Sequence, residues 1–172
     1  MIIAVSGLAG SGKNTFGTAL AKKLGYRIVC PTFKDLADSA GVSLLEFQKM
    51  AHDNPEIDKQ FDTHLKQEAD EGNCIVTTWL GPWIVNADYR IWINAPSEVR
   101  AERLAKREGS SVKEALEHIQ KRDADNRARY LKLYGIDILE HKGFDLILNS
   151  EKNTPQKMVE LALNALKKDK KM

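Results

Sequence analysis

The chain has 172 residues, of which 42% are hydrophobic and 29% are charged, and its formal net charge is +2. This length fits one globular domain over residues 1–172 and does not require a second. The near-neutral charge excludes a uniform positive field that would hold a long nucleic acid through counterion release, so we expect any anion site to be local.

The cysteines and the N-terminal residues bear on the cellular compartment. Cys30 and Cys74 lack the spacing of a metal site, and a chain of this size does not call for a disulfide, so we expect buried free thiols. Residues 1–5 run directly into a glycine-rich turn, with no basic leader and no apolar segment long enough for a signal peptide or a membrane span. We therefore expect a cytoplasmic protein with no membrane partner.

Short apolar runs alternate with longer, periodic charged segments along the chain. Five of these runs are too short and too apolar to be surface helices: 2–6, 26–30, 74–78, 89–94 and 144–149. Parallel strands joined by crossover helices have this pattern. We predict an α/β three-layer sandwich, in which helices flank a five-stranded parallel sheet.

Capping residues and glycines predict where the helices begin and end. Start signals occur at Ser43 with Glu46, Ser111 with Glu114, Asn54-Pro55, Thr154-Pro155 and Ser97. Glycines that we expect to end helices are Gly25, Gly41, Gly72, Gly109, Gly135 and Gly143. Most glycines therefore indicate chain reversal, and the cluster after the first strand is the exception.

A glycine-rich loop follows the first predicted strand directly. Its residues are Gly7, Leu8, Ala9, Gly10, Ser11, Gly12, Lys13, Asn14 and Thr15. They satisfy G-x-x-x-x-G-K between a strand and a helical run, which is the context of a P-loop. Successive backbone N–H groups converge on one point, and the helix N-terminus adds its positive end. We predict that this loop binds the phosphates of ATP and that Lys13 reaches the β and γ phosphates.

The sequence offers no side chain at the usual magnesium positions. Asn14 stands where most P-loops carry a Ser or Thr that ligates Mg²⁺, and the third predicted strand ends in Thr77 and Thr78, where an acidic residue is usual. We therefore expect no metal ligand from the chain, and Mg²⁺ held mainly by the nucleotide's phosphates and by water.

Six arginines lie in residues 97–134, where we predict a helical lid: Arg100, Arg103, Arg107, Arg122, Arg127 and Arg129. Spacings of three and four put the first three on one helix face, and a spacing of seven puts Arg122 and Arg129 on one face of a second helix. If the helices fold back on each other, both faces can close over the P-loop. Acidic residues are interspersed, so we expect about half of the arginines to be structural.

Phosphoryl transfer suits such a lid, because guanidinium groups clamp the charge of the transition state while water is excluded. The four histidines lie in no recognisable catalytic setting, and we expect exposed helix positions for them: His52, His64, His118 and His141. A phosphate acceptor needs no base, since its oxygen is already ionised at neutral pH. These residues predict transfer between two phosphates, with small-molecule nucleotides as partners.

Nearly the whole chain resembles the archaeal-type (type 2) cytidylate kinases, in the nucleoside monophosphate kinase family of P-loop proteins. Besides the P-loop, the resemblance is carried by residues 41–47 (GVSLLEF), 55–58 (PEID), 90–93 (RIWI), 95–103 (APSEVRAER) and 129–137 (RYLKLYGID). It implies an enzyme of pyrimidine nucleotide metabolism that phosphorylates CMP or dCMP with ATP and Mg²⁺, with a mobile lid over a five-stranded sheet.

The resemblance also implies roles for individual residues. Arg103 and Arg107 would face ATP from the lid, and with Lys13 and Arg122 they are the expected catalytic residues. Arg122 and Arg129 would reach the transferring phosphate and the monophosphate. Asn126, one turn before Arg129, lies near where the family contacts cytosine, and its amide could hydrogen-bond a base edge.

Departures from the family pattern fall on the acceptor side. Residues 77–79 read Thr-Thr-Trp where the family usually reads Glu-Gly-Arg, which removes an arginine that would hold the monophosphate. Lys34 stands where the family normally has arginine, and lysine cannot reproduce a bidentate fork, so we expect weaker or altered monophosphate binding. Trp79 has two readings, namely packing, as we expect for Trp83, and stacking on the acceptor base.

Three alternatives to a cytidylate kinase-like enzyme stay open. The same reaction on a different monophosphate fits the departures. A non-catalytic ATP-binding P-loop module would bind ATP without forming product. An RNA-binding factor that uses Lys34, the lid arginines and the lysines of residues 167–171 would show steep salt dependence, and the near-neutral charge argues against it. We expect a monomer.

Overall fold

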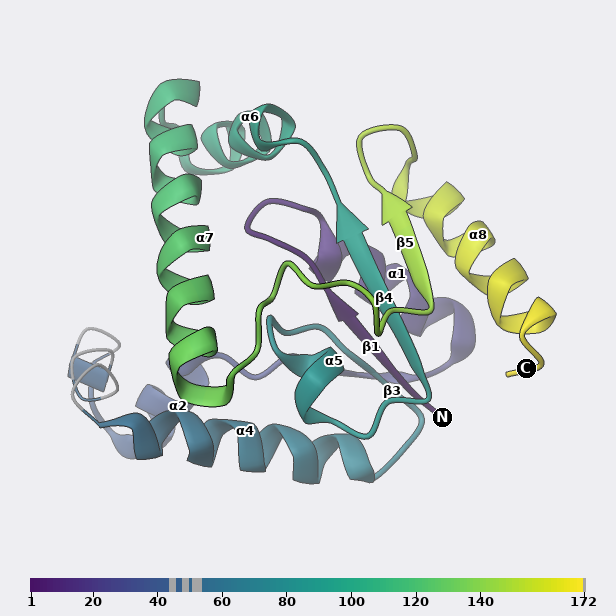
Figure 1. Cartoon of the computed structure of the whole chain (residues 1–172), viewed down its shortest axis with the longest axis horizontal. Helices are drawn as coiled ribbons and strands as arrows, with labels where there is room; N and C mark the ends of the chain where they lie inside the picture. Colours follow the sequence, from purple (N-terminus) through teal and green to yellow (C-terminus); the bar gives the residue numbers. More distant parts are fainter. Residues whose placement is uncertain (44–45, 48–49, 51–53, 172) are drawn as a thin grey trace.

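The computed structural model of the chain describes residues 1–43, 46–47, 50 and 54–171, apart from the side chains of Phe33, Lys34 and Pro55. Its strands form one parallel sheet in the order β2-β3-β1-β4-β5 (Figure 1). They are β1 (Ile2–Ser6), β2 (Arg27–Val29), β3 (Cys74–Val76), β4 (Tyr89–Asn94) and β5 (Leu146–Asn149). The predicted five-stranded parallel sheet is confirmed.

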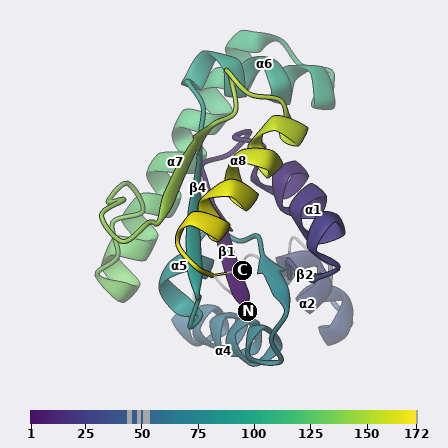
Figure 2. The same cartoon turned by 90° about the vertical axis from the view of Figure 1, so that its right-hand side faces the viewer.

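Helices connect the strands and cover both faces of the sheet. They are α1 (Lys13–Leu24), α2 (Phe33–Ala40), α4 (Pro55–Asp70), α5 (Gly81–Ile84), α6 (Ser97–Glu108), α7 (Val112–Tyr134) and α8 (Pro155–Lys168). Figure 2 shows α1 and α8 on one side of the sheet and α5 on the other. Within the described ranges, no helix is both long enough and apolar enough to cross a lipid bilayer.

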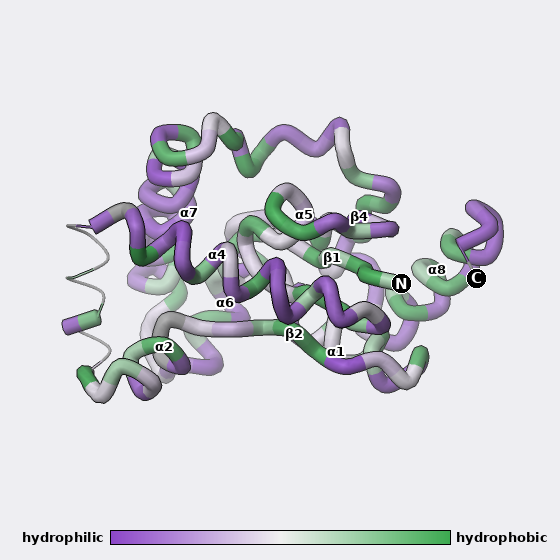
Figure 3. Tube along the Cα trace, turned by 90° about the horizontal axis from the view of Figure 1, so that it is seen from below, coloured by the Kyte–Doolittle hydropathy of each residue, from purple (hydrophilic) through white to green (hydrophobic). Residues whose placement is uncertain are grey.

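Two buried clusters hold the layers together, one on each face of the sheet. On the first face, Phe16 and Leu20 of α1 and Met158 and Leu166 of α8 pack against the strands. On the second face, Leu65 and Ala69 of α4 pack against residues that include Ala4, Val29 and Val76. The strands are apolar on both faces, as expected for a parallel sheet between helices, whereas α4 alternates between hydrophilic and hydrophobic residues (Figure 3).

A third cluster lies beyond the sheet and joins the helical hairpin of α6 and α7 to the P-loop. Ala101 and Leu104 of α6 and Ala115 and Ile119 of α7 bury their side chains together with Ala9 of the loop. In Figure 1 the two helices rise from the end of β4 and stand beside the loop that follows β1. The segment predicted as a lid therefore shares hydrophobic packing with the phosphate loop.

Most predicted helix ends are confirmed. Ser111 and Glu114 form a capping box, Ser43 and Glu46 exchange the same hydrogen bonds, and Pro55 and Pro155 begin their helices. Ser97 is the first residue of α6, which confirms the start signal there, and the residue before it, Pro96, is the N-cap. One detail was wrong, since no helix ends at Gly143, which lies in a turn before β5.

Three predicted strands are shorter than expected, because the chain enters the sheet later or leaves it earlier than predicted. The predicted strand 74–78 ends at Val76, after which the Gly81 N–H donates to Thr78 Oγ1 (2.9 Å) in a turn toward α5. The predicted strands 26–30 and 144–149 reduce to Arg27–Val29 and Leu146–Asn149. The shortened carboxyl ends of β2 and β3 lie at the same edge of the sheet as the P-loop, whereas β5 is shortened at its amino end.

The order of the strands places that site. β1 lies between β3 and β4, so the connections from neighbouring strands diverge on either side of its carboxyl end. In open parallel sheets, ligands bind in the crevice that forms where the strand order reverses. The P-loop leaves β1 at that point.

Candidate active site

The P-loop is a tight turn that only glycine permits at several positions. Gly10 and Gly12 have φ values of 75° and 91°, in the left-handed region. A Cβ atom added at Gly7 would lie 2.6 Å from the Ile93 carbonyl oxygen, so the loop presses directly on β4. Gly12 is the N-cap of α1 and gives it no side-chain cap, so the first amides of that helix face outward with its positive dipole end. An anion fits there.

Lys13 is the first residue of α1 and is half-buried among cations and acids. Burial lowers the pKa of Lys13 to about 8, and the nearby Arg122 and Arg107 act in the same direction, while Cys30 and Asp123 oppose it. Because burial and nearby cations disfavour the charged form of Lys13, a bound polyanion would stabilise that charged form more than it would for an exposed lysine. This fits the predicted role of Lys13 at the β and γ phosphates.

Trp79 lies between Lys13 and the lid. The Lys13 Nζ is 5.5 Å from the centre of the indole ring, and the Arg122 Cζ is 6.0 Å from the same centre. Both distances allow cation–π attraction. The ring also packs against the cluster that joins α6, α7 and Ala9. Trp79 therefore takes part in packing, and two of the predicted catalytic cations lie near its ring. Stacking of its ring on an acceptor base stays a prediction.

Arg103 binds the phosphate loop and the end of β5. Its Nη1 donates to Ser150 Oγ (2.9 Å), its Nη2 donates to the Ser150 carbonyl (2.7 Å), and Nη1 also lies 3.4 Å from the Ser11 carbonyl. Ser150 Oγ in turn donates to the Ser11 carbonyl (2.7 Å). Arg107 is exposed and pairs with the neighbouring Glu108 (2.9 Å), one helical turn farther from the loop.

Arg100 and Asp123 were not singled out as site residues, yet they hold the loop most closely. Arg100 Nη1 donates both to the Ala9 carbonyl (3.0 Å) and to Asp123 Oδ2 (2.6 Å), and the Ala9 N–H donates to Asp123 Oδ1 (3.3 Å). Side-chain exposure is only 8% for Arg100 and 14% for Asp123. Burial is what distinguishes Arg100 and Asp123 from the other charged residues of the segment, and the charge pattern of the sequence does not reveal which side chains are buried.

On the predicted acceptor side, α7 pairs with α4. Arg129 forms an ion pair with Asp58, and the Tyr134 hydroxyl donates to Asp62 one turn farther along α4. Burial raises the pKa of Asp62 to about 6, the charge of Asp58 adds to this, and the Tyr134 hydrogen bond opposes it. Asn126 is half-buried one turn before Arg129. Arg129 is thus held by a carboxylate where it was expected to reach a phosphate.

The other predicted residues fall in different surroundings. Asn14 is exposed, and its amide points to Cys30 Sγ (3.7 Å), which donates to the Thr77 carbonyl (3.3 Å). Cys30 is therefore half-buried rather than buried, whereas Cys74 is buried, and both are free thiols. The side chain of Lys34, on α2, lies outside the described part of the chain.

Several of the six arginines are held by carboxylates, and the partners of Arg127 and Arg129 lie outside residues 97–134. Arg127 makes a two-point, partly exposed ion pair with Asp137 (2.8 and 2.6 Å), so it is structural. The expectation for the histidines was wrong at His141. It is half-buried, and its ring lies 4.1 Å from that of Trp92, because residues 135–145 fold back over β4. Trp83 packs edge-on against Phe144 (5.2 Å), as expected.

The fit of a divalent metal can be tested on the donor atoms present. No group of three His, Cys, Asp or Glu residues within the described chain could hold a metal ion. Thr77 and Thr78 are buried at the end of β3, and Thr78 Oγ1 is already used by the Gly81 N–H. Asp123, the acid next to Lys13, is tied to Arg100. These residues do not form a protein cage for Mg²⁺.

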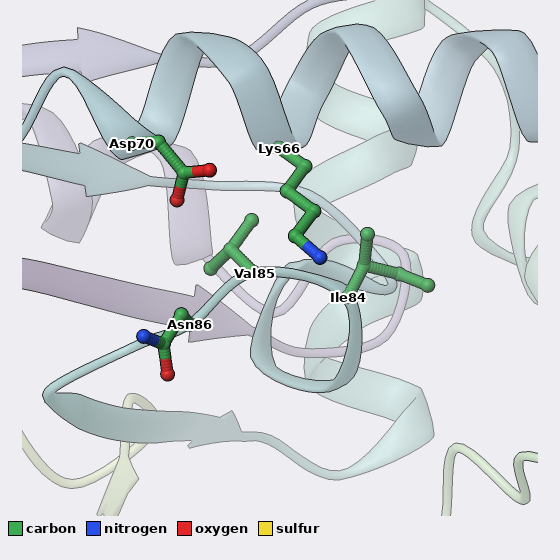
Figure 4. Close-up of a pocket in the computed structure, with 5 residues that line it drawn as sticks. All are labelled: Lys66, Asp70, Ile84, Val85 and Asn86. Carbon is green, nitrogen blue, oxygen red and sulfur yellow. The ribbon is translucent and has the colours of Figure 1, made fainter.

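A separate hollow of about 410 Å³ lies between α4 and the segment after α5. It is lined by Lys66, Asp70, Ile84, Val85 and Asn86 (Figure 4). These residues precede β3 and β4 in the chain, so the hollow lies near the amino ends of those strands. The P-loop lies at the carboxyl ends, and the hollow is therefore not part of the candidate site.

The sequence is similar to one family of known proteins. Residues 2–152 match the sequence model of the cytidylate kinase-like family. A cytidylate kinase of Pyrococcus horikoshii is 47% identical over 159 residues, 91% of this chain and 83% of that protein. A cytidylate kinase of Ignicoccus hospitalis is 41% identical over 163 residues, 92% of this chain and 95% of that protein.

Solved structures support the fold at lower identity. An uncharacterized protein of Eubacterium ventriosum superposes with a TM-score of 0.72 at 18% identity, covering 97% of this chain and 98% of that one. Shikimate kinase of Acinetobacter baumannii superposes with a TM-score of 0.65 at 14% identity, covering 98% and 94%. By the match of its sequence over nearly its whole length, the chain belongs to the cytidylate kinase-like family.

Proposed function

We propose that the protein is a nucleoside monophosphate kinase that transfers the γ-phosphoryl group of ATP to CMP or dCMP. The observation that carries this is the gathering of Lys13, Arg103 and Arg122 at one uncapped helix N-terminus, in a chain of the cytidylate kinase-like family. The two relatives named cytidylate kinase above are 47% and 41% identical to it over the aligned residues.

In this reaction an ionised phosphate oxygen of the acceptor attacks the γ phosphorus. A new P–O bond forms to the acceptor, the bond from the γ phosphorus to the β–γ bridging oxygen breaks, and ADP leaves with that electron pair. No base is needed, because the attacking oxygen carries no proton at neutral pH. The outward amides of Gly12 and Lys13 bind the β phosphate, while Lys13 and Arg122 neutralise charge on the moving group.

Arg103 has a different part in the proposal. Its contacts with Ser150 and with the loop carbonyls hold the guanidinium at the rim of the P-loop, where ATP phosphates lie. Arg107, one turn farther out, is free to swing from Glu108 to the nucleotide, since an exposed pair of this kind holds it weakly.

For the acceptor, we propose that Arg129 exchanges Asp58 for the monophosphate, with Asn126 near the base and Lys34 and Trp79 at the rim of the acceptor site. Magnesium ion, which ATP carries in solution, is proposed to be held by phosphate oxygens and water, because the donor atoms of the described residues do not cage it. No step is assigned to it.

The departures at residues 77–79 favour one second candidate, the same transfer to a different nucleoside monophosphate. Without an arginine at Trp79, the acceptor phosphate has one bidentate partner fewer. The acceptor site lies in the same place in both candidates, which therefore differ only in the base or sugar of the acceptor.

An acceptor screen separates these candidates. ADP release is coupled to a spectroscopic assay with CMP, dCMP, UMP, AMP and GMP in turn, at one ATP and Mg²⁺ concentration. We expect the largest kcat/KM with CMP or dCMP. A higher value with another monophosphate would select the second candidate, and ATP binding with no turnover on any of the five would indicate a non-catalytic module.

A further inference from the structure

We propose that Asp123 is a positioning residue of the transfer site, whose carboxylate ties the lid helix α7 to the backbone of Ala9 and so fixes Arg122 opposite Lys13. The inference rests on the proposed function, which assigns no role to Asp123 or to its partner Arg100. It explains why a carboxylate of α7 lies against a loop that is built to bind anions.

The geometry is a closed ring of three hydrogen bonds. Asp123 accepts from the Ala9 N–H through Oδ1 (3.3 Å) and from Arg100 through Oδ2 (2.6 Å), and Arg100 donates to the Ala9 carbonyl (3.0 Å). The backbone N–H and carbonyl of Ala9 are thus both hydrogen-bonded to an ion pair whose two side chains are almost fully buried. In such surroundings the loss of one charged partner leaves the other unpaired, which is costly.

This ring decides which loop amides are available for phosphate. The Ala9 N–H already faces a carboxylate, so a phosphate oxygen beside it would be repelled by that charge. Phosphate therefore binds to the amides that follow, from Gly10 onward. The backbone of α6 supports this arrangement, since a Cβ at Gly10 would lie 2.8 Å from the Arg100 carbonyl oxygen.

The same ring sets the rotation of α7 about its axis. Neighbouring residues of a helix point about 100° apart, so fixing Asp123 against Ala9 also fixes the direction of Arg122. That direction leads to the Trp79 ring, whose centre is 6.0 Å from Arg122 Cζ and 5.5 Å from Lys13 Nζ. Asp123 thus positions the Arg122 side chain for the transferring phosphate without contacting the nucleotide itself.

Asp123 has an electrostatic effect as well. Four groups act on Lys13: Arg122 of α7 and Arg107 of α6 favour loss of its proton, while Asp123 of α7 and Cys30 after β2 favour its retention. Removing the carboxylate therefore makes Lys13 lose its proton at lower pH, which a purely structural contact would not do.

The test compares Asp123→Asn with Asp125→Asn, an exposed acid two residues along the same helix. For each variant, kcat with CMP and the ATP affinity by titration calorimetry are measured across the alkaline range, together with the thermal midpoint. We expect Asp123→Asn to lose about 10-fold to 100-fold in kcat and to lose ATP affinity at lower pH than the wild type. Asp125→Asn should match the wild type within about twofold, because surface charges contribute little.

Two results would overturn the proposal: a kcat for Asp123→Asn within about threefold of wild type, or an unmoved pH dependence of ATP affinity. If Asp123→Asn does not fold, Asp123→Glu is measured instead, because glutamate keeps the charge and displaces the hydrogen bonds. We expect this variant to have a reduced kcat and the pH dependence of the wild type. A wild-type kcat would overturn the proposal. Calorimetry needs no acceptor, so a protein that binds ATP but phosphorylates nothing would refute the proposed function, while the pH dependence of ATP affinity would still test the role of Asp123.

Discussion

Arg129 of α7 forms an ion pair with Asp58 of α4, its Nε lying 3.2 Å from Asp58 Oδ2. The far end of the lid helix is therefore joined to the helix on the proposed acceptor side. Asp58 is buried, and its carboxylate occupies the guanidinium fork that a phosphate would use. In the proposed function the two anions would compete for Arg129, and acceptor binding would be linked to the contact between α7 and α4.

Replacing Arg129 by lysine tests this exchange. We expect Arg129→Lys to raise the KM for CMP about tenfold and to leave the KM for ATP nearly unchanged, because an ammonium group cannot form the two-point contact. Arg127→Lys is the matched control, since Arg127 of the same helix pairs with Asp137. Equal effects of the two substitutions on the KM for CMP would show that Arg129 does not reach the acceptor.

Proton uptake on ATP binding follows from the state of Lys13. Its pKa of about 8 in the free protein means that the side chain is largely neutral at about pH 9, whereas the unfolded chain would still hold the proton. Triphosphate beside the amine favours the charged form, so binding at that pH takes up a proton, and uptake vanishes when the pH falls well below 8.

Calorimetry in two buffers of different ionisation enthalpy measures that proton. Lys13→Arg is the control, because a guanidinium group stays charged throughout this range. A buffer-independent binding enthalpy for the wild type at about pH 9 would refute the expected uptake.

Trp79 offers an optical readout of the site. We expect ATP or CMP to change the intrinsic fluorescence, because phosphate draws Lys13 and Arg122 away from the indole face. Trp79→Phe should abolish most of the change and retain turnover within about threefold, since a phenyl ring still offers a π face. Trp83→Phe should keep the signal, as Trp83 packs against Phe144. A full change in the Trp79→Phe protein would exclude Trp79 as the reporter.

Local sequence patterns predicted much of this molecule. The P-loop could be identified because its glycines, its lysine and its flanking strand and helix are contiguous in the chain. The capping boxes at Ser43 and Ser111 are likewise local, as each requires only a hydroxyl and a carboxylate three residues apart. The five strands followed from their uniform apolar character, which burial on both faces of a parallel sheet imposes.

What the sequence could not supply is the pairing of distant residues. Asp123 and Ala9 are 114 positions apart, and Arg129 and Asp58 are 71 apart. Each contact depends on how α7 is rotated and where it lies against its neighbours, and neither quantity is encoded in spacing along one helix. His141 was misjudged for the same reason, since only the folded loop brings it to Trp92.

Asp62 predicts a dependence of stability on pH. Its pKa in the folded protein, about 6, lies above the ordinary value of 3.8, so the ionised form is disfavoured by folding. Above pH 6 this cost is fully present, and it declines as the pH falls from 6 toward 3.8. Asp62→Asn should therefore unfold at a higher temperature than the wild type at about pH 8, and this advantage should shrink at about pH 4.5. Asp125→Asn serves as the exposed control, and an advantage that does not depend on pH would contradict the assignment.

In the proposed reaction, the uncapped start of α1 and Lys13 hold a triphosphate, and the terminal phosphoryl group passes to CMP. The most direct measurement follows the label of γ-³²P ATP after incubation with the protein and CMP, separating the products by chromatography. We expect the label in CDP, in equal amount to the ADP formed, and loss of both products in Lys13→Met. Label released as inorganic phosphate, or label that stays in ATP while CMP is present, would show that the protein does not transfer the γ-phosphoryl group to CMP.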